Sequence, residues 1–310
     1  MLAKSPEELK DVVHIISDLE MRYDMALNSY IELLSCSYRQ LLETERQGWP
    51  EGFDNISFNE KLWQFLSSAR SITEKAELTE KKRKSHEPLV VLSENSRVKG
   101  ASILVESVYE YVSEQRVKNH AYELMQVIRN IMTHSGLFQN AISYTYISDK
   151  KLREASIQFD LHEIIRKCKG THKEEENIIA VTNALCSFFN EYDVPILAGL
   201  YVESISHIMS IVRMHTIPMC EDIACRLDGI RKQVGPLDDI PADDLYFLKS
   251  ENGPLGIIEH CESLLDEIQR LRTKNIRPPI NSSSLSFDCT LDFSKPAHFW
   301  LIFQRKCHRC

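Results

Sequence analysis

Glycine and proline, the two residues that most often end helices and build tight turns, are scarce in this sequence, with 10 glycines and 11 prolines in 310 residues. A fold rich in β-turns needs more of both, so the composition favours long helices. Long apolar runs are also missing: no run of 18 apolar residues occurs, and the stretch VPILAGLYV is followed by a glutamate. The first residues, MLAKSPEELKD, lack the apolar core of a secretory signal. We therefore expect a cytoplasmic protein without a membrane segment.

Positive charge is not in excess either. The formal net charge is −8, and residues 1–150 and 151–310 contribute −4 each. Generic, charge-driven binding to nucleic acid is therefore not indicated, whereas a local basic groove stays compatible with these numbers. The glycine-rich patterns of nucleotide-binding loops and the GxSxG pattern of hydrolases are absent. The odd number of cysteines, nine, indicates reduced thiols and not a disulfide framework.

Apolar residues recur with a helical period along most of the chain. In the first half, the pattern predicts a helix over about residues 6–47 with one break and a second that opens with a capping box at Ser57. It also predicts a helical stretch over 101–132, in which the polar residues 116–120 mark either a tight turn or an exposed helix face. In the second half, it predicts one helix over 149–168, one capped by Thr171, and three that begin at Pro195, Pro218 and Pro254.

The predicted fold class is therefore all-α. Residues 1–148 form a helical bundle, and residues 149–310 form a second helical domain. The tail after residue 280 differs, because LSFDCTLDF alternates apolar and polar residues and HFWLIF is apolar and aromatic. This pattern predicts a short β-hairpin near residues 285–303.

The stretch RNIMTHSG brings Arg129, Asn130 and His134 to the end of an apolar-periodic helix. Asn130 and His134 are one turn apart on one face, and the long side chain of Arg129 can reach the same patch. A histidine that titrates near neutral pH can move a proton, and an arginine can hold a phosphate through two hydrogen bonds. These residues suit attack by an RNA 2′-hydroxyl on the neighbouring phosphate, which needs no metal ion and no cofactor.

A structural explanation competes with this one. Cationic side chains suit the last turn of a helix because they complement its dipole, and Gly136 is a natural helix end. The spacing is loose enough to recur by chance, and Arg166 and His172 form a second such pair without the polar residue after the arginine. The alternative to an enzyme is therefore a catalytically silent helical interaction or regulatory protein.

On these residues the chain resembles the HEPN superfamily of helical-bundle domains. RNIMTH matches the family motif of an arginine, a polar residue, a few further residues and a histidine on the last core helix. FNEKLWQFLSSARSITEK, with Arg70 in its middle, is similar to the second helix of many members. The resemblance covers about residues 5–145. It implies a metal-independent endoribonuclease of a toxin or phage-defence system, with RNA as substrate, catalysis by Arg129, Asn130 and His134, and a homodimer that brings two motifs into one cleft.

Two further patterns bear on regulation and metal binding. The family subtype with a nucleotidyltransferase antitoxin carries a tyrosine two positions after the histidine, where this chain has Gly136, so the resemblance leaves the kind of antitoxin or other regulatory partner open. Tyr144 and Tyr146 follow closely. The terminal CHRC, with Cys289 or His298, resembles half a zinc site, but a second CxxC pair is missing, so no metal is expected.

Overall fold

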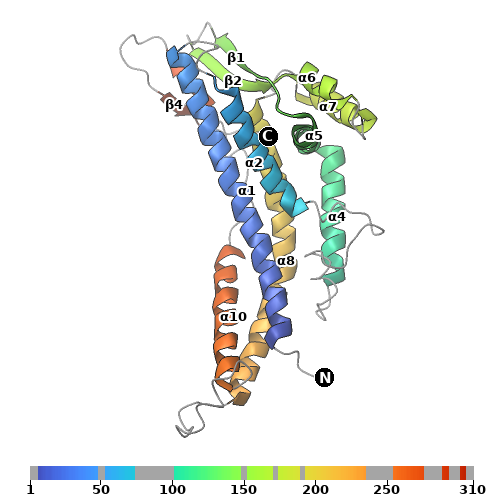
Figure 1. The fold of residues 1–310 in the computed structure, drawn as a ribbon, viewed down its shortest axis with the longest axis vertical. Coiled ribbons are helices and arrows are strands. Elements are labelled where there is room, and N and C mark those ends of the chain that lie inside the picture. The colour runs from blue at the N-terminus through green and yellow to red at the C-terminus, as the bar shows by residue number, and fades with distance from the viewer. Residues whose placement is uncertain are drawn as a thin grey trace. The chain divides into compact units, whose positions relative to one another are not determined.

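A computed structural model describes residues 6–47, 53–73, 101–147, 152–169, 174–188, 193–234, 254–275, 288–292 and 301–304. Most of these residues are helical, which confirms the predicted all-α class (Figure 1). The helices in this part of the chain are α1 (Pro6–Gln47), α2 (Asn55–Thr73), α4 (Ala101–Lys118), α5 (His120–Ser135), α6 (Leu161–Cys168), α7 (Glu174–Phe188), α8 (Val194–Val234) and α10 (Pro254–Asn275).

The chain divides into two compact units, each assembled from separate segments. Unit 1 comprises residues 1–21, 75–109 and 208–278, and unit 2 comprises residues 22–74, 110–207 and 279–310. Helices α1, α4 and α8 therefore supply residues to both units. The domain boundary expected between residues 148 and 149 lies outside the described residues and stays a prediction.

Polar side chains cap the N-termini of α2, α5 and α8 in unit 2. The Asp54 carboxylate accepts hydrogen bonds from the backbone amides of residues 56 and 57, at 3.1 and 3.0 Å, and so caps α2. Asn119 caps α5 at the break between α4 and α5, which is the turn alternative for residues 116–120, and Asp193 caps α8. The cap of α2 was expected at Ser57 and is instead three residues earlier, because an aspartate in that position satisfies two amides at once.

Two expected helix breaks do not occur. Helix α1 is continuous, and Pro218 lies inside α8 instead of at a helix start. A proline within a helix removes one backbone hydrogen bond. Here the buried face of α8 continues on both sides of the proline, with Val212 before it and Met219 after it, and we attribute the unbroken helix to this burial.

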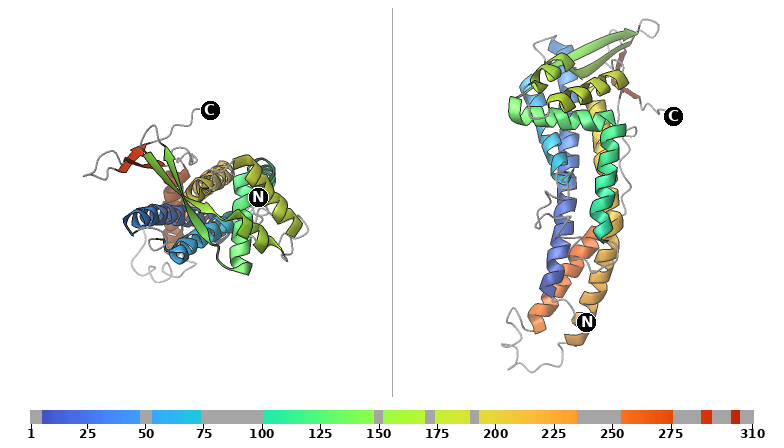
Figure 2. Two further views of the ribbon diagram at one scale, coloured as in Figure 1. Left: turned by 90° about the horizontal axis from the view of Figure 1, so that it is seen from above. Right: turned by 90° about the vertical axis from the view of Figure 1, so that its right-hand side faces the viewer.

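A four-stranded antiparallel sheet belongs to unit 2, with strand order β1-β2-β3-β4. The strands are β1 (Asn140–Ile147), β2 (Leu152–Phe159), β3 (Asp288–Asp292) and β4 (Leu301–Gln304). The pairing of β3 with β4 confirms the predicted terminal hairpin. The pairing of β1 with β2, which Figure 2 shows as two long neighbouring strands, was not predicted.

The single helix predicted over residues 149–168 is therefore wrong for its first part. Residues 152–159 form β2, and only residues 161–168 form helix α6. In β2, buried Ile157 and Phe159 alternate with half-buried Ser156 and Gln158, which is the period of a strand with one covered face. The prediction is right for the second part, where Asp160 caps helix α6 and the helical pattern begins.

The core of unit 2 is formed where α2, α5 and the first part of α8 supply buried side chains. Phe65 on α2 packs edge-to-face on Tyr201 of α8, with ring centroids 5.8 Å apart. Arg70, in the middle of the sequence stretch FNEKLWQFLSSARSITEK, donates to Gln126 at 2.8 Å, and Gln126 donates to the Tyr201 hydroxyl at 2.7 Å. Arg70 therefore connects α2 to α5 in the structure.

Helix α8 is the one described helix that is long and apolar enough to cross a membrane, over Val194–Gly229, by length and composition. More than half of its apolar window is buried within the protein, which is also typical of a core helix. In unit 1, this helix carries a buried ion pair: Arg213 donates to both carboxylate oxygens of Glu20, at 2.7 Å each. The pair satisfies both charges away from water.

Candidate functional site

The N-terminus of α5 is fixed by a network of polar side chains. The Asn119 side chain accepts from the Tyr122 amide at 3.1 Å and donates to Ser204 at 3.0 Å and to Gln115 at 3.1 Å. Beside it, burial, followed by the charges of nearby glutamates, raises the pKa of Tyr111 to about 12. The hydroxyl of Tyr111 is therefore neutral at physiological pH. This network sets the start of the helix that carries the candidate residues.

Nine buried residues on α5 hold the helix in the core of unit 2. They include Leu124, Met125 and Ile128, all fully buried. Complete burial of a side chain of this size stabilises a fold by about 1.5–3 kcal/mol. The three candidate residues lie toward the C-terminal end of α5. Arg129 and Asn130 are half-buried there, and His134 is exposed.

Arg129 is held by its neighbour in the sequence. Its Nη1 lies 3.3 Å from the Asn130 side-chain oxygen, which accepts the hydrogen bond. Its Nε is buried and has no hydrogen-bond partner in the described part of the protein. A buried donor without a partner costs free energy, roughly 1–3 kcal/mol, and more for a charged group. The described residues therefore leave the guanidinium short of an acceptor, and because Nε itself is buried, an anion would have to bind at another part of the group.

His134 lies in the last turn of α5 and is exposed to solvent. At about 100° per residue, Asn130 and His134 are separated by about 40° around the helix, while Arg129 and His134 are separated by about 140°. Among the described residues, no hydrogen bond joins His134 to Arg129 or Asn130. The structure thus brings Arg129 and Asn130 together, and leaves His134 as a separate exposed group one turn further on.

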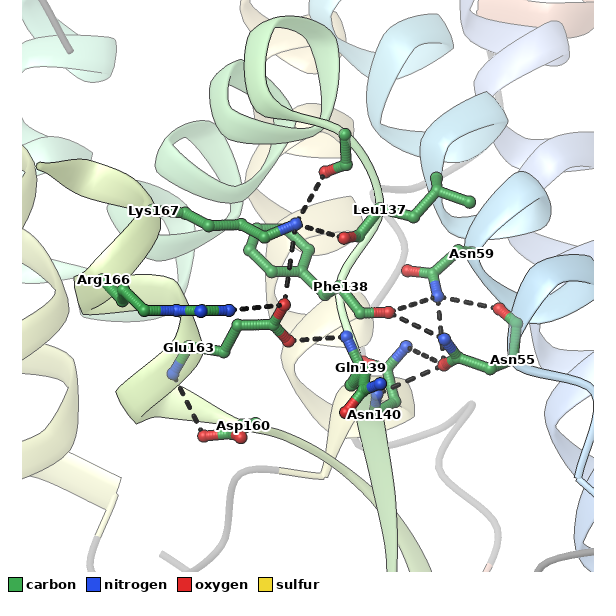
Figure 3. Close-up of polar contacts among 11 residues, drawn as sticks. Asn55, Asn59, Leu137, Phe138, Gln139, Asn140, Asp160, Glu163, Arg166 and Lys167 are labelled. Carbon is green, nitrogen blue, oxygen red and sulfur yellow. Dashed lines mark hydrogen bonds and ion pairs between the residues drawn. The ribbon is translucent and has the colours of Figure 1, made fainter. Parts of the chain in front are cut away.

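Gly136 ends α5 with a φ of 84°, in the left-handed region that favours glycine. This was the predicted helix end. The residues that follow, 136–140, are called the α5–β1 segment below. Side chains from α2 and α6 hold this segment from both sides, as Figure 3 shows.

From α6, Lys167 and Glu163 bind the backbone of the α5–β1 segment. The Lys167 ammonium donates to the carbonyls of Gly136, at 3.4 Å, and of Leu137, and it lies 5.0 Å from the centre of the Phe138 ring. Glu163 accepts from the Gln139 amide at 2.6 Å. A cation thus lies against the carbonyls of the cap residue and of the residue after it, at the end of α5 where the helix dipole favours positive charge.

From α2, two asparagines bind the same segment. Asn55 and Asn59 both donate to the Phe138 carbonyl, at 2.8 and 2.9 Å. The Asn55 side-chain oxygen accepts from the amide and the side chain of Asn140, at 3.2 and 3.1 Å. Sequence reasoning missed this network and that of α6. The one sequence signal for the network of α2 was that Asn55 and Asn59 are one helical turn apart. Their partners, Phe138 and Asn140, lie about 80 residues further along the chain.

Those of the other singled-out residues that the structure describes do not gather into a second site. Arg166 is on α6 beside Lys167, and His172 lies outside the described residues. Of the zinc pattern, Cys289 is in β3, while the remaining positions, His298, Cys307, His308 and Cys310, are outside the described part. No group of three potential metal ligands occurs among the described residues. Tyr144 and Tyr146 belong to β1.

No protein family, curated protein or solved structure was found to match this chain.

Proposed function

We propose that this protein is a metal-independent endoribonuclease that cleaves RNA through its 2′-hydroxyl, with Arg129, Asn130 and His134 as its functional residues. The observation that carries the proposal is the state of Arg129. Its Nε is buried with no hydrogen-bond partner among the described residues, and its Nη1 is held by Asn130, so these residues leave part of the guanidinium's hydrogen-bonding capacity unused. The resemblance of RNIMTH to the HEPN motif supports an RNA phosphate as the anion that Arg129 binds.

In the proposed reaction, His134 removes the proton from a 2′-hydroxyl, and the 2′-oxygen forms a bond to the adjacent phosphorus. The bond from phosphorus to the 5′-oxygen of the next nucleotide breaks, which leaves a 2′,3′-cyclic phosphate. Arg129 stabilises the negative charge that builds up on the phosphate oxygens, and Asn130 orients the guanidinium. The departing 5′-oxygen takes a proton from a second acid, such as the other His134 of a homodimer.

The resemblance to the HEPN superfamily also supports a proposal for the assembly, location and biological role of the protein. We propose a homodimer in the cytoplasm that acts as a toxin or phage-defence effector and is kept silent by an antitoxin or another regulatory protein. Two copies would supply two imidazoles, and cleavage of RNA often uses two groups that transfer protons.

The direct test is to incubate the purified chain with total RNA in EDTA and to compare it with a folded His134→Ala variant. We expect wild type to cut and to leave cyclic phosphate ends, and we expect the variant to be slower by roughly 10²-fold or more. An all-2′-deoxy substrate should stay intact, since it lacks the nucleophile. Equal cleavage by the two proteins would rule out His134 as a catalytic residue.

A second candidate function is a helical interaction protein without catalytic activity. It is favoured by the structural contacts around the α5–β1 segment, since Lys167 near the end of α5 stabilises a helix terminus without any role in catalysis. The separation of about 140° between Arg129 and His134 around α5 also favours it. If wild type cuts no RNA under any condition tested, this account becomes the better one.

A further inference from the structure

The last turn of α6 lies beside the chain that follows His134. The contacts of Lys167 with the carbonyls of Gly136 and Leu137 place the end of α6 two to three residues along the chain from His134. Helices α5 and α6 also pack against each other. The surface next to His134 therefore includes residues of α6, and a polymer bound at His134 can reach them.

Two charged residues of α6, Lys167 in its last turn and Glu163 in its first, are already engaged by the α5–β1 segment. The Lys167 side chain is 17% exposed, and its ammonium is taken up by the two carbonyls and the ring of Phe138. The Glu163 side chain is 12% exposed, and one of its oxygens accepts from the Gln139 amide. Neither group is available to a ligand without a loss of these contacts.

Arg166 differs from both. Its side chain is 75% exposed, and within the described structure its recorded partner is Glu163, at 3.6 Å from Nη2. That distance is too long for a hydrogen bond. Arg46 on α1 provides a comparison, because it is also exposed and pairs with a glutamate three residues earlier. There the guanidinium donates two hydrogen bonds to Glu43, at 3.0 and 2.6 Å. Two donors of Arg46 are therefore occupied, whereas among the described residues no hydrogen bond is made by the guanidinium of Arg166.

We propose that Arg166 binds a phosphate of the RNA next to the nucleotide on which His134 acts. The proposal rests on the proposed ribonuclease function and names a further contact for its substrate. A planar guanidinium with exposed donors can bind a phosphate through two hydrogen bonds. A local cation is also what a chain with a net charge of −8 needs in order to hold a polyanion. Arg166 in this account is a binding residue and not a catalytic one.

The binding test uses a short, single-stranded, fully 2′-O-methylated RNA, which cannot be cut, with a fluorescent label. Binding to the full chain is followed by anisotropy over a range of KCl concentrations. We expect Arg166→Gln to raise Kd by about 3–10-fold and to lower the slope of log K against log salt by about 0.7, the value for one lost phosphate contact on a single strand. Arg166→Lys should keep the slope. Arg46→Gln, which removes an equally exposed arginine, should change neither quantity.

The corresponding cleavage assay separates this inference from the function on which it rests. With cleavable RNA, Arg166→Gln should raise KM and leave kcat unchanged. If wild type cuts RNA but Arg166→Gln and Arg46→Gln behave alike in both assays, the phosphate contact is wrong and the nuclease stands. If Arg166→Gln weakens binding and wild type does not cut, the nuclease is wrong and the contact stands. If wild type binds no RNA, both are overturned.

Discussion

The half-buried Arg129 has a different environment from Arg213, a buried arginine of α8. Both oxygens of Glu20 satisfy Arg213. Arg129 has the side-chain oxygen of Asn130 as its recorded acceptor, and its Nε is without one among the described residues. This difference at a single residue is the physical reason to look for an anion at the end of α5.

The first prediction at the residue scale concerns the planar guanidinium group of Arg129. Arg129→Ala should reduce cleavage by roughly 10²-fold or more, and Arg129→Lys should restore only part of it, because an ammonium cannot form the planar pair of hydrogen bonds. Initial rates at saturating RNA measure both effects. His172→Ala is the control and should cut as wild type does. Full activity of Arg129→Lys would show that only charge matters there.

The second prediction concerns two cysteines of α8. Burial, with a smaller effect of Glu221, raises the pKa of Cys220 to about 12, and Cys225 is exposed. Since the thiolate is the reactive form, iodoacetamide at pH 8 should modify Cys225 and spare Cys220 in the folded protein. In concentrated urea both should react. Peptide mass spectrometry measures the two sites separately, and equal labelling without urea would mean that Cys220 is accessible.

At the scale of elements, the caps decide where helices begin. Asn119 both accepts from the Tyr122 amide and donates to Ser204 on α8. Asn119→Ala should therefore lower the free energy of unfolding by roughly 1–2 kcal/mol, measured by urea denaturation. Asn119→Asp keeps the cap acceptor but loses the donor, so its loss should be smaller. Asn28→Ala, at an exposed position of α1, is the control and should cause no loss, because alanine has the higher helix propensity. A loss as large there would mean that the effect at position 119 is not specific to capping.

The sequence carried enough information for most helices and for the terminal hairpin, because apolar period and turn residues are local signals. It failed at β2, where the pattern of α6 was extended backwards over LREASIQF, and at Pro218, where burial outweighs the helix-breaking residue. For the candidate site, the end of α5 at Gly136 was predictable. The partners of the α5–β1 segment were not, since Asn55 and Lys167 approach it only through the tertiary fold.

At the scale of the whole molecule, one prediction concerns acid stability. The Arg270 hydrogen bond, together with Ser17, lowers the pKa of Glu267 to about 2, while burial opposes this shift. A carboxylate with a lowered folded-state pKa stabilises the protein above its unfolded pKa of roughly 4.3, and this stability is lost as pH falls toward 2. Because the Arg270 side chain is 49% exposed, solvent screens the pair, and we expect about 0.5–1 kcal/mol at neutral pH.

The measurement is urea unfolding of wild type and Glu267→Gln at pH 7 and at pH 2.5. The difference between the two proteins should be present at pH 7 and should shrink at pH 2.5. A difference that is the same at both pH values would show that the charge of Glu267 does not matter, and that the variant is destabilised through packing alone.

A second whole-molecule prediction concerns assembly. If the proposed ribonuclease needs two copies of His134, sedimentation equilibrium at about 10 μM should give twice the 35.9 kDa of one chain. His134→Ala should sediment as wild type does, since the substitution removes a proton-transfer group and not a contact known to join protomers. A monomer that still cuts RNA would refute the dimer but not the nuclease.

The order in which the sheet of unit 2 is completed has a consequence during synthesis. β1 and β2 are neighbours in the sequence and can pair early, whereas residues 152–154 of β2 pair with β3, at residues 290–292. At about 5–20 residues per second, a ribosome needs roughly 6–30 s to translate the chain between them. For that time the nascent protein displays an unpaired strand edge to which another growing chain could add. A chain whose translation stalls before β3 should therefore depend on chaperones more than the finished protein does.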